Sequence, residues 1–507
     1  MADAPTTKGE KQSVHEMENE PAKGDGGLKG VAPEQRELYL QFQSKDDEWK
    51  EFHSKKLLRR LDFRLLPLIV LMYLLNFLDR SNLAQARLGT LEEDLGMDGT
   101  DFNLATSIFF VGYLLMQLPS NLILTRVRPS LYLGSCVMLW GVVSTAQSSV
   151  KNFGSLVAAR VCLGIAEAPF FPGTIMLMSS WYTRRELTVR IAWFYSGNAL
   201  ANMFGGLLGA GVLGNLHNAQ GIAGWRWLFI IEGVITIGVA LVAMVILPDF
   251  PGAAKWLSDE ERQFAQWRLV DDAKESDDSQ ATTIMQGLKV AVMDPRLYIF
   301  VLLQHLSLLS QTFQYFFPSI VETLGFDNNI VTLLLTVPVW FATFLTSLFV
   351  TWTSGKTGDR SIHIIALMMV SCLGNVIATA ASQVGARFFA MFLMPMGAVA
   401  AYQIILSWVA NSFPRPMIKR SAVIAICNMI GNTSSIYGSY MYPESSGPQY
   451  VPGGSTNSVI CLLVASIALI IRLIHIRANK KLEKAENEAV EQSADGEARG
   501  EGFRYVL

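Results

Sequence analysis

Residues 64–86 read RLLPLIVLMYLLNFLDRSNLAQA, a stretch long enough to cross the hydrocarbon of a bilayer as one helix. Asp79 and Arg80 interrupt this apolar run near its end, and a second pair, Arg160 and Glu167, interrupts another apolar run. Each such charge costs about 2.5–3.5 kcal/mol at the bilayer centre on insertion scales, so four of them need a compensating role. The usual role is a pathway for a substrate or a proton, which makes a membrane transporter the first interpretation of the chain.

The composition indicates that water is not the main solvent of this chain. Of its 507 residues, 51% are hydrophobic and 17% are charged, against roughly 25% charged in soluble domains. The formal net charge of -2 excludes a global basic field, so no nucleic-acid partner is expected. The 5 cysteines fall inside apolar runs without metal-ligand spacing, so neither a disulfide framework nor a metal site is predicted.

Twelve apolar runs of spanning length follow one another along the chain. The first six lie at 64–86, 102–124, 130–149, 153–178, 189–213 and 226–247. The other six lie at 297–320, 329–352, 362–381, 386–410, 421–441 and 457–476. They predict an all-α, polytopic membrane fold of twelve transmembrane helices in two six-helix halves.

The polar segments between these runs set the expected domain boundaries. Residues 1–60 are expected to form a largely disordered tail that becomes partly helical as it approaches the membrane. Residues 61–247 and 296–477 form the two halves, residues 248–295 a central loop, and residues 478–507 a second tail. Two blocks of similar length joined by one long loop suggest duplicated halves with a midplane site between them.

Basic residues in the short loops alternate onto one side of the membrane, which the positive-inside rule assigns to the cytosol. They are Arg126, Arg128, Arg184, Arg185, Lys356, Arg360, Arg415, Lys419 and Arg420. Both tails and the central loop are then cytosolic. The plasma membrane is the expected location, and the vacuolar membrane remains an alternative.

This organisation resembles the major facilitator superfamily. A more specific marker is Gly358-Asp359-Arg360 between the eighth and ninth spans, which is similar to the superfamily's loop signature and implies a gating loop. The matching loop of the first half departs from that signature and reads Pro119-Ser120-Asn121. This form is similar to the one in the anion:cation symporter family, especially its fungal allantoate and vitamin permease branch.

More of that branch's pattern occurs between residues 60 and 477. The fragments include Asn76-Phe77-Leu78-Asp79-Arg80-Ser81-Asn82, Arg160 with Gly164 and Glu167, the block GWRWLFIIEG at 224–233, and Asn428 with Gly431 and Asn432. In the symporter family, the positions that match the four intramembrane charges are associated with proton coupling and carboxylate binding. The resemblance therefore implies that Arg80 and Arg160 bind substrate and that Asp79 and Glu167 carry the coupled proton.

The spacing of the charges indicates how they pair. Arg160 and Glu167 are seven residues apart, so they share one helical face about two turns apart and need partners from another helix. Because spans one and four run in opposite directions, Asp79 with Arg160 and Arg80 with Glu167 are the expected pairs. Two alternatives remain: static Asp79–Arg160 and Arg80–Glu167 pairs that fix helix register, and an Arg80 that snorkels to the interface.

The chemistry of these side chains agrees with the implied roles. A planar guanidinium matches a carboxylate through two parallel hydrogen bonds, and arginine stays charged at any physiological pH. Burial disfavours the ionised form of a carboxyl group, so the acids are the groups that can gain and lose a proton.

The seventh span carries a polar stripe, Gln304, Ser307, Gln311 and Gln314, whose spacing places all four on one face of one helix. A polar stripe in lipid faces inward, so we expect it to line the cavity with His305 beside it; interhelical hydrogen bonding is the alternative. Candidate substrate-binding residues from this half are Gln304, Gln311, Gln314, Tyr402, Asn428 and Asn432.

Two further features favour structural roles. Arg226 and Glu232 in the sixth span are interpreted as an interface anchor and a structural charge. The fifth span has a stripe of small residues that should let another helix approach closely. The stripe consists of Gly197, Ala201, Gly205 and Gly209.

No P-loop, nucleophile elbow, zinc motif or dinucleotide fingerprint occurs in the sequence, so neither an enzyme nor a cofactor is expected. The expected function is secondary active transport, namely proton-coupled import of a small organic anion by alternating access in a monomer. Its partners are the substrate, protons and the lipid bilayer. An exporter of a fungal secondary metabolite and a non-transporting nutrient sensor are the alternatives, and the identity of the substrate stays open.

Overall fold

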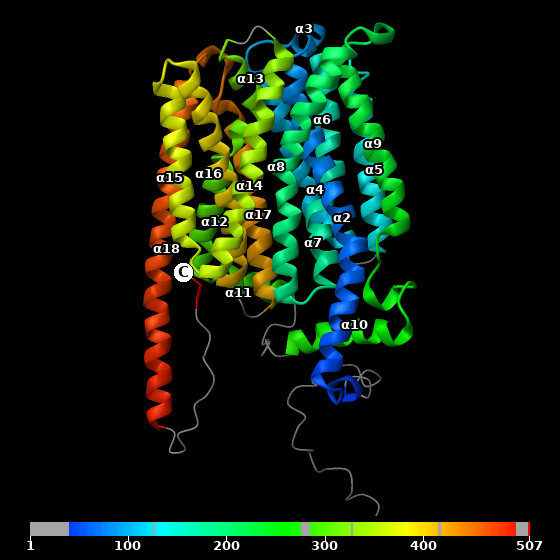
Figure 1. The fold of residues 1–507 in the computed structure, drawn as a ribbon, viewed down its shortest axis with the longest axis vertical. Coiled ribbons are helices and arrows are strands. Elements are labelled where there is room, and N and C mark those ends of the chain that lie inside the picture. The colour runs from blue at the N-terminus through cyan, green and yellow to red at the C-terminus, as the bar shows by residue number, and fades with distance from the viewer. Residues whose placement is uncertain are drawn as a thin grey trace, which may run out of the picture.

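The structure is a computed structural model that describes residues 40–124, 127–274, 284–325, 328–413, 417–492 and 505–506. Within those ranges every regular element is a helix, and the long helices run between two opposite faces of the molecule (Figure 1). We name these the α3 face and the α10 face, after α3 (Leu91–Leu95) and α10 (Asp259–Lys274), which lie at the top and bottom of Figure 1.

Helices occupy all six expected positions in the first part of the chain. They are α2 (Asp47–Arg87), α4 (Asp101–Leu124), α5 (Pro129–Gln147), α6 (Phe153–Glu167) followed by α7 (Phe170–Ser179), α8 (Arg184–Asn215) and α9 (Gly224–Ile246). The short 3-10 helices η2 (Ala219–Gly221) and η3 (Pro251–Ala253) flank α9.

Helices also occupy the six expected positions in the second part. They are α12 (Pro295–Leu309) with η4 (Thr312–Phe316) and α13 (Phe317–Glu322), then α14 (Asn329–Thr357), α15 (Ser361–Ala380), α16 (Val384–Ser412), α17 (Met417–Gly438) and α18 (Val451–Gln492). Outside them lie α11 (Ile284–Val292), η5 (Ser439–Met441) and η6 (Glu444–Ser446). Eight helices of the described ranges are by themselves long and apolar enough to cross a membrane. The predicted all-α fold is confirmed.

The two end helices are longer than the spans that hydropathy marks. The first begins at Asp47, where Asp46 accepts a hydrogen bond from the Asp47 N–H, so the expected helical approach is the start of α2 itself. Of the tail expected at residues 1–60, residues 1–39 lie outside the described residues, as do Arg126, Arg415 and residues 275–283 of the central loop.

The seventh span is broken, contrary to the single helix that the spacing of its polar residues predicts. Its first part, α12, ends at Leu309 and passes into η4. Ser310 and Gln311 both donate side-chain hydrogen bonds to the Ser307 carbonyl, and Thr312 donates to the Leu309 carbonyl. Polar side chains that bond to nearby carbonyls compete with the regular helical ladder, and three of them cluster at this break.

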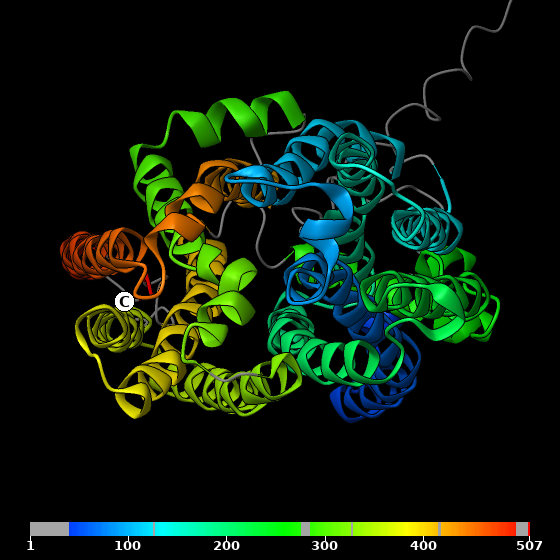
Figure 2. The ribbon, with the colours of Figure 1, turned by 90° about the horizontal axis from the view of Figure 1, so that it is seen from above.

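The helices gather in two bundles, α2–α9 and α12–α18, as Figure 2 shows from above. The bundles meet along α8 with α14 and along α4 with α17. A Cβ at Gly206 of α8 would lie 2.9 Å from the Leu333 carbonyl of α14, so this contact requires glycine. The predicted small-residue stripe does allow close approach, because Gly197 and Gly205 of α8 lie directly against Tyr73 and Gln85 of α2.

Candidate substrate cavity

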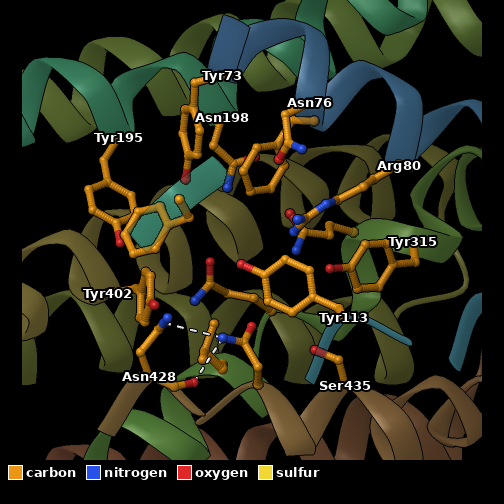
Figure 3. Close-up of a pocket in the computed structure, with 16 residues that line it drawn as sticks. Tyr73, Asn76, Arg80, Tyr113, Tyr195, Asn198, Tyr315, Tyr402, Asn428 and Ser435 are labelled. Atoms are coloured by element: carbon orange, nitrogen blue, oxygen red, sulfur yellow. Dashed lines mark hydrogen bonds between the residues drawn. The ribbon is translucent and has the colours of Figure 1, made fainter. Parts of the chain in front are cut away.

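A cavity of about 60 Å³ lies between the two bundles, near the middle of α17 (Figure 3). A water molecule needs roughly 10–15 Å³ by this measure, so the cavity has room for a few of them. The α2–α9 bundle contributes Tyr73, Asn76, Phe77, Arg80, Tyr113, Phe171, Tyr195 and Asn198. The α12–α18 bundle contributes Leu308, Gln311, Gln314, Tyr315, Tyr402, Asn428, Asn432 and Ser435. Arg80 is the one charged residue among these sixteen described residues.

Six of the sequence-predicted substrate-binding residues line the cavity: Arg80, Gln311, Gln314, Tyr402, Asn428 and Asn432. The other two, Arg160 and Gln304, are buried behind its wall and are 2% and 1% exposed. Asp79 and Glu167, predicted to carry the proton, are fully buried and also lie behind the residues that form the wall.

Arg80 and Glu167 form the ion pair that the opposite directions of spans one and four predict. The Arg80 Nε donates to Glu167 Oε2 at 2.7 Å, and Asn76 donates to the same oxygen at 2.7 Å. The Arg80 side chain is 10% exposed and that of Glu167 is 0% exposed, so the arginine lies between the acid and the cavity. The other carboxylate oxygen, Oε1, is buried and has no hydrogen-bond partner in the described ranges.

Aromatic rings hold the guanidinium of Arg80 in place. Its Cζ lies 4.9 Å from the ring centroid of Phe109, 5.0 Å from that of Tyr113 and 5.3 Å from that of Phe77. Cations are attracted to such ring faces, most strongly where water is excluded. The position of Arg80 is therefore set by both the carboxylate and the rings, and the snorkelling alternative is wrong.

The predicted Asp79–Arg160 pair is wrong. Asp79 accepts hydrogen bonds from Trp140 Nε1 at 3.0 Å, Ser144 Oγ at 2.6 Å and Thr236 Oγ1 at 3.4 Å, so it faces α5 and α9. Arg160 donates to the Ala105 carbonyl at 3.2 Å, with its Cζ 5.2 Å from the Phe109 centroid. Adjacent residues on a helix point about 100° apart, so Asp79 and Arg80 face different neighbours.

The polar stripe of the seventh span divides at the helix break. Gln311 and Gln314, beyond the end of α12, line the cavity, whereas Gln304 packs against Gly431 of α17. His305, expected beside the stripe, instead contacts the Ile430 carbonyl and the Tyr437 hydroxyl of α17. The residues that reach the cavity from this span therefore come from its irregular part.

Sequence reasoning missed most of the aromatic lining. Tyr73, Asn76, Phe77 and Arg80 recur at the spacing of one helical face, which is a signal that the sequence did contain. Tyr113, Tyr195 and Tyr315 belong to three further elements and have no such signal (Figure 3). Their convergence depends on how the bundles pack.

Contacts between the bundles bound the cavity at both ends. Toward the α3 face, Asn103 donates to the Ser439 carbonyl, Asn329 donates to the Leu88 carbonyl, and the Phe102 and Phe316 rings lie 5.6 Å apart. Toward the α10 face, the rings of Tyr195 and Tyr402 meet edge to face at 6.2 Å. These are the contacts that must break and re-form if access to the cavity alternates.

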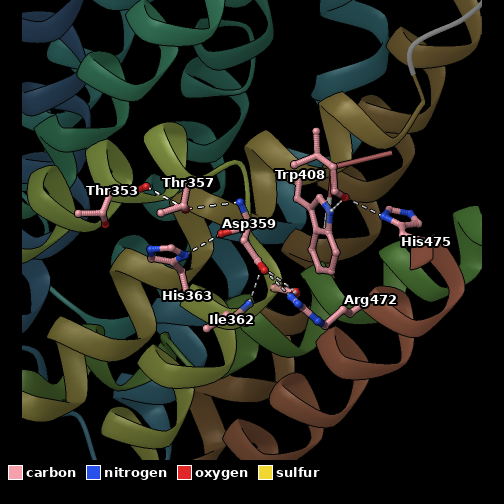
Figure 4. A network of polar contacts seen from close by, with 10 residues as sticks. Thr353, Thr357, Asp359, Ile362, His363, Trp408, Arg472 and His475 are labelled. Carbon is pink, nitrogen blue, oxygen red and sulfur yellow. Dashed lines mark hydrogen bonds and ion pairs between the residues drawn. The ribbon is translucent and has the colours of Figure 1, made fainter. Parts of the chain in front are cut away.

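The predicted gating loop lies on the α10 face, at the end of α14 (Figure 4). Gly358 has a φ of +67°, which favours glycine, and it ends α14. Asp359 accepts hydrogen bonds from Ser361 Oγ and from the Ile362 N–H, and forms an ion pair with Arg472 of α18 at 2.5 Å. The motif thus joins α14, α15 and α18 within one bundle.

Comparison with known proteins agrees with this architecture. The family model described as Major Facilitator Superfamily matches residues 69–439. The chain belongs to the major facilitator superfamily. It is therefore a multi-pass membrane transporter that acts on small molecules, and members of this superfamily are not enzymes.

Three relatives cover between 76% and 92% of this chain. The chain is 34% identical to the MFS-type transporter cnsO of Penicillium expansum, over 92% of this chain and 94% of that protein. It is 31% identical to the major facilitator-type transporter hxnP of Emericella nidulans, over 90% of this chain and 93% of that protein. It is also 33% identical to a putative tartrate transporter of Agrobacterium vitis, over 76% of this chain and 87% of that protein.

Solved structures of the superfamily share the fold. A bacterial homolog of the human lysosomal transporter Spinster, in an inward-facing and unoccupied conformation, superimposes with a TM-score of 0.62 at 14% identity, over 84% of this chain and 97% of that one. The xylose transporter XylE from E. coli gives a TM-score of 0.58 at 15% identity, over 79% and 96%.

Proposed function

We propose that the chain imports a small organic anion together with a proton, as a member of the anion:cation symporter family. The observation that carries the proposal is the placement of Arg80. It is a guanidinium on the wall of a cavity whose other described lining residues are neutral, and its counter-ion Glu167 is buried behind it. A carboxylate that enters such a cavity meets one positive charge and a set of neutral hydrogen-bond donors.

The Arg80–Glu167 pair links anion binding to proton binding. While Glu167 is ionised, it holds Arg80 through the 2.7 Å bond to its Oε2. A proton on the unpartnered Oε1 cancels the negative charge and leaves Arg80 free to pair with the carboxylate of the substrate. The proton and the anion then bind together. Arg80 is paired with the Glu167 carboxylate before they bind and with the substrate carboxylate afterwards.

Two independent features support an anion as the substrate. The relative from Agrobacterium vitis is named for tartrate, which is a small carboxylate. The fragments of the fungal allantoate and vitamin permease branch include Asn76, Arg80 and Glu167, three side chains that interact at the cavity. Candidate substrates are nicotinate, allantoate, pantothenate and sugar acids.

The orientation of the chain in the membrane follows, in this proposal, from the distribution of basic residues. Lys356 and Lys419 lie at the ends of α14 and α17 near the α10 face, which we assign to the cytosol. The external medium then faces α3, and an acidic medium drives uptake across the plasma membrane. Gly358, Asp359 and Arg360 form the gating loop on the cytosolic side in this scheme.

The experiment compares the wild type with Glu167→Gln in proteoliposomes, with labelled tartrate and nicotinate at two external pH values. The variant fixes the neutral form of the side chain, so Arg80 stays free and exchange of substrate persists. Accumulation against a gradient is lost because no proton leaves or enters residue 167. Counterflow measures the exchange and a pH jump measures the accumulation.

Glu93→Gln is the matched control, because Glu93 is exposed on α3 and remote from the cavity. It should accumulate substrate as the wild type does. Native accumulation by Glu167→Gln rejects the proton role of Glu167. A wild type that takes up neither anion from this panel at acidic pH rejects the proposed substrate class.

A further inference from the structure

Two carboxyl groups lie in the core of the α2–α9 bundle, behind the wall of the cavity. Asp79 of α2 is 0% exposed and Glu232 of α9 is 1% exposed. The charged group that acts on Glu232 is the Asp79 carboxylate, so each of these acids has another acid as a neighbour. Two buried like charges strongly oppose being ionised together.

The same three helices supply two layers of polar side chains around these acids. In the first layer, Asp79 of α2 accepts hydrogen bonds from Ser144 of α5 and Thr236 of α9. The second layer lies one helical turn nearer the α3 face. It consists of Asn82 of α2, Gln147 of α5 and Glu232 of α9, three or four residues along each helix from its counterpart in the first layer.

The two layers differ in their hydrogen bonds. Asp79 receives three donors, which favours its ionised form. In the second layer, both amide atoms of Gln147 are buried without a hydrogen-bond partner in the part of the chain that the structure describes, and the polar side chain that acts on the Glu232 carboxyl group is the Asn82 amide. A buried ionised carboxylate that faces one amide donor, another carboxyl group and no cation is strongly unfavourable, whereas the protonated acid is a neutral group.

We propose that the second layer is a proton-binding site, in which Glu232 carries a proton while its neighbour Asp79 is ionised. The site takes a proton rather than a substrate, because it lies inside one bundle and apart from the cavity residues. It contradicts the interpretation of Glu232 as a structural charge. Nothing in the superfamily match or in the names of the relatives assigns a role to this residue.

The other charged groups near the pair leave this assignment unchanged. Glu167 and Arg160, both on α6, act on Asp79 with opposite signs. Arg226, the cation in the first turn of α9, donates to the Ser148 carbonyl and lies over the Trp225 ring, at the α3 face. From α8, the residues packed against this part of α2 include Ala201, Gly205 and Gly209, which are uncharged.

The position of the site gives it a role in coupling, and that role rests on the proposed function. Glu232, Asn82 and Gln147 lie between Asp79 and the α3 face. A proton that enters from that face reaches Glu232 first and passes to Asp79 within the bundle. A proton at this site therefore enters by a route separate from that of the anion, and the site is distinct from Glu167 at the cavity wall.

The test is infrared spectroscopy of the full-length protein in liposomes at neutral pH, without substrate. A buried protonated acid gives a carboxylic carbonyl band that shifts on transfer to deuterated water. The wild type should show this band and Glu232→Gln should lose it, whereas the control Glu93→Gln should keep it. If Glu232→Gln fails to fold, Asp79→Asn serves instead, and should retain the band with an altered frequency because its ionised neighbour is gone.

Two results overturn the proposal. One is a band of wild-type intensity in folded Glu232→Gln. The other is a band that the wild type shows only when sodium is replaced by choline, which would mean that a sodium ion occupies the layer. Because the measurement uses no substrate, it is independent of the uptake assays that test the proposed function.

Discussion

The two bundles differ in the charge of the side chains that they place at the cavity and behind its wall. The α2–α9 bundle buries Asp79, Arg160, Glu167 and Glu232 in its interior, and a fifth charged residue, Arg80, reaches the cavity. The α12–α18 bundle lines the same cavity with neutral side chains. The comparison indicates that the first bundle handles the proton and the charge of the substrate, while the second recognises its shape and its hydrogen-bonding groups.

Both bundles nevertheless contain a pair of hydrogen-bonded asparagines near the cavity. Asn198 and Asn202 of α8 are four residues apart, and Asn202 donates to the Asn198 side chain at 2.9 Å. Asn428 and Asn432 of α17 repeat this arrangement at 3.2 Å. The two bundles thus share a pair of asparagines near the cavity, and the α2–α9 bundle adds charged residues at the cavity wall and directly behind it.

Arg80→Ala should give the largest effect on substrate binding. A charge-assisted hydrogen bond contributes about 1.5–3 kcal/mol to binding, so its loss should raise the Kd by roughly 10- to 150-fold. Binding of labelled tartrate and nicotinate to the purified protein measures the change. Arg80→Lys keeps the charge but loses the planar fork, and should recover part of the affinity.

Arg59→Ala is the control for this variant, because Arg59 lies on the same helix and is exposed near its start. It should bind as the wild type does. If Arg80→Ala binds with native affinity while a variant of the α12–α18 bundle loses binding, then the α12–α18 bundle, and not Arg80, binds the charge of the substrate.

Asn428→Leu should give a smaller and more selective effect. One neutral hydrogen bond contributes about 0.5–1.5 kcal/mol, so the KM should rise by roughly 2- to 12-fold. The change should differ between tartrate and nicotinate, because their polar groups lie differently against α17. The external-pH dependence of uptake should stay the same, since no proton site is altered.

Thr433→Val, a polar-to-apolar change on the same helix, is the matched control, because the Thr433 hydroxyl donates to the Ile430 carbonyl and is not part of the cavity lining. Its KM for both anions should be native. A changed pH dependence in Asn428→Leu would show that the neutral bundle takes part in proton coupling.

The sequence predicts the fold and the Arg80–Glu167 pair because both depend on local rules. Hydropathy marks the twelve spans, and opposite helix directions bring residues 80 and 167 together. Pairing charges on spans of opposite direction fails for Asp79. Its partners Trp140, Ser144 and Thr236 are neutral residues on two other helices, and no charge in the sequence points to them.

Other parts of the site depend on packing that a sequence pattern does not contain. The break after Leu309, where three side chains bond to nearby carbonyls, precedes Gln311 and Gln314, which line the cavity. The contact between Tyr195 and Tyr402 joins residues from different bundles. Neither feature has a periodic signature.

Asp359→Asn should give the smallest effect on substrate handling, because Asp359 is a charge of the α12–α18 bundle that lies outside the cavity. Burial alone would raise the pKa of this carboxyl group, but hydrogen bonds from Arg472, Ile362 and Ser361 outweigh burial and lower it. The group is then ionised throughout the range from about pH 5 to pH 8, and its contribution to stability is lost only as the pH falls below its ordinary pKa of 3.8.

The variant should therefore lower the Tm in detergent by a few degrees at every pH in that range, because it weakens the ion pair with Arg472. The KM for the anion and the shape of the pH profile should match the wild type. A pH profile shifted like that of Glu167→Gln would mean that protons act on the loop that joins α14, α15 and α18. The charges that couple transport would then belong to both bundles.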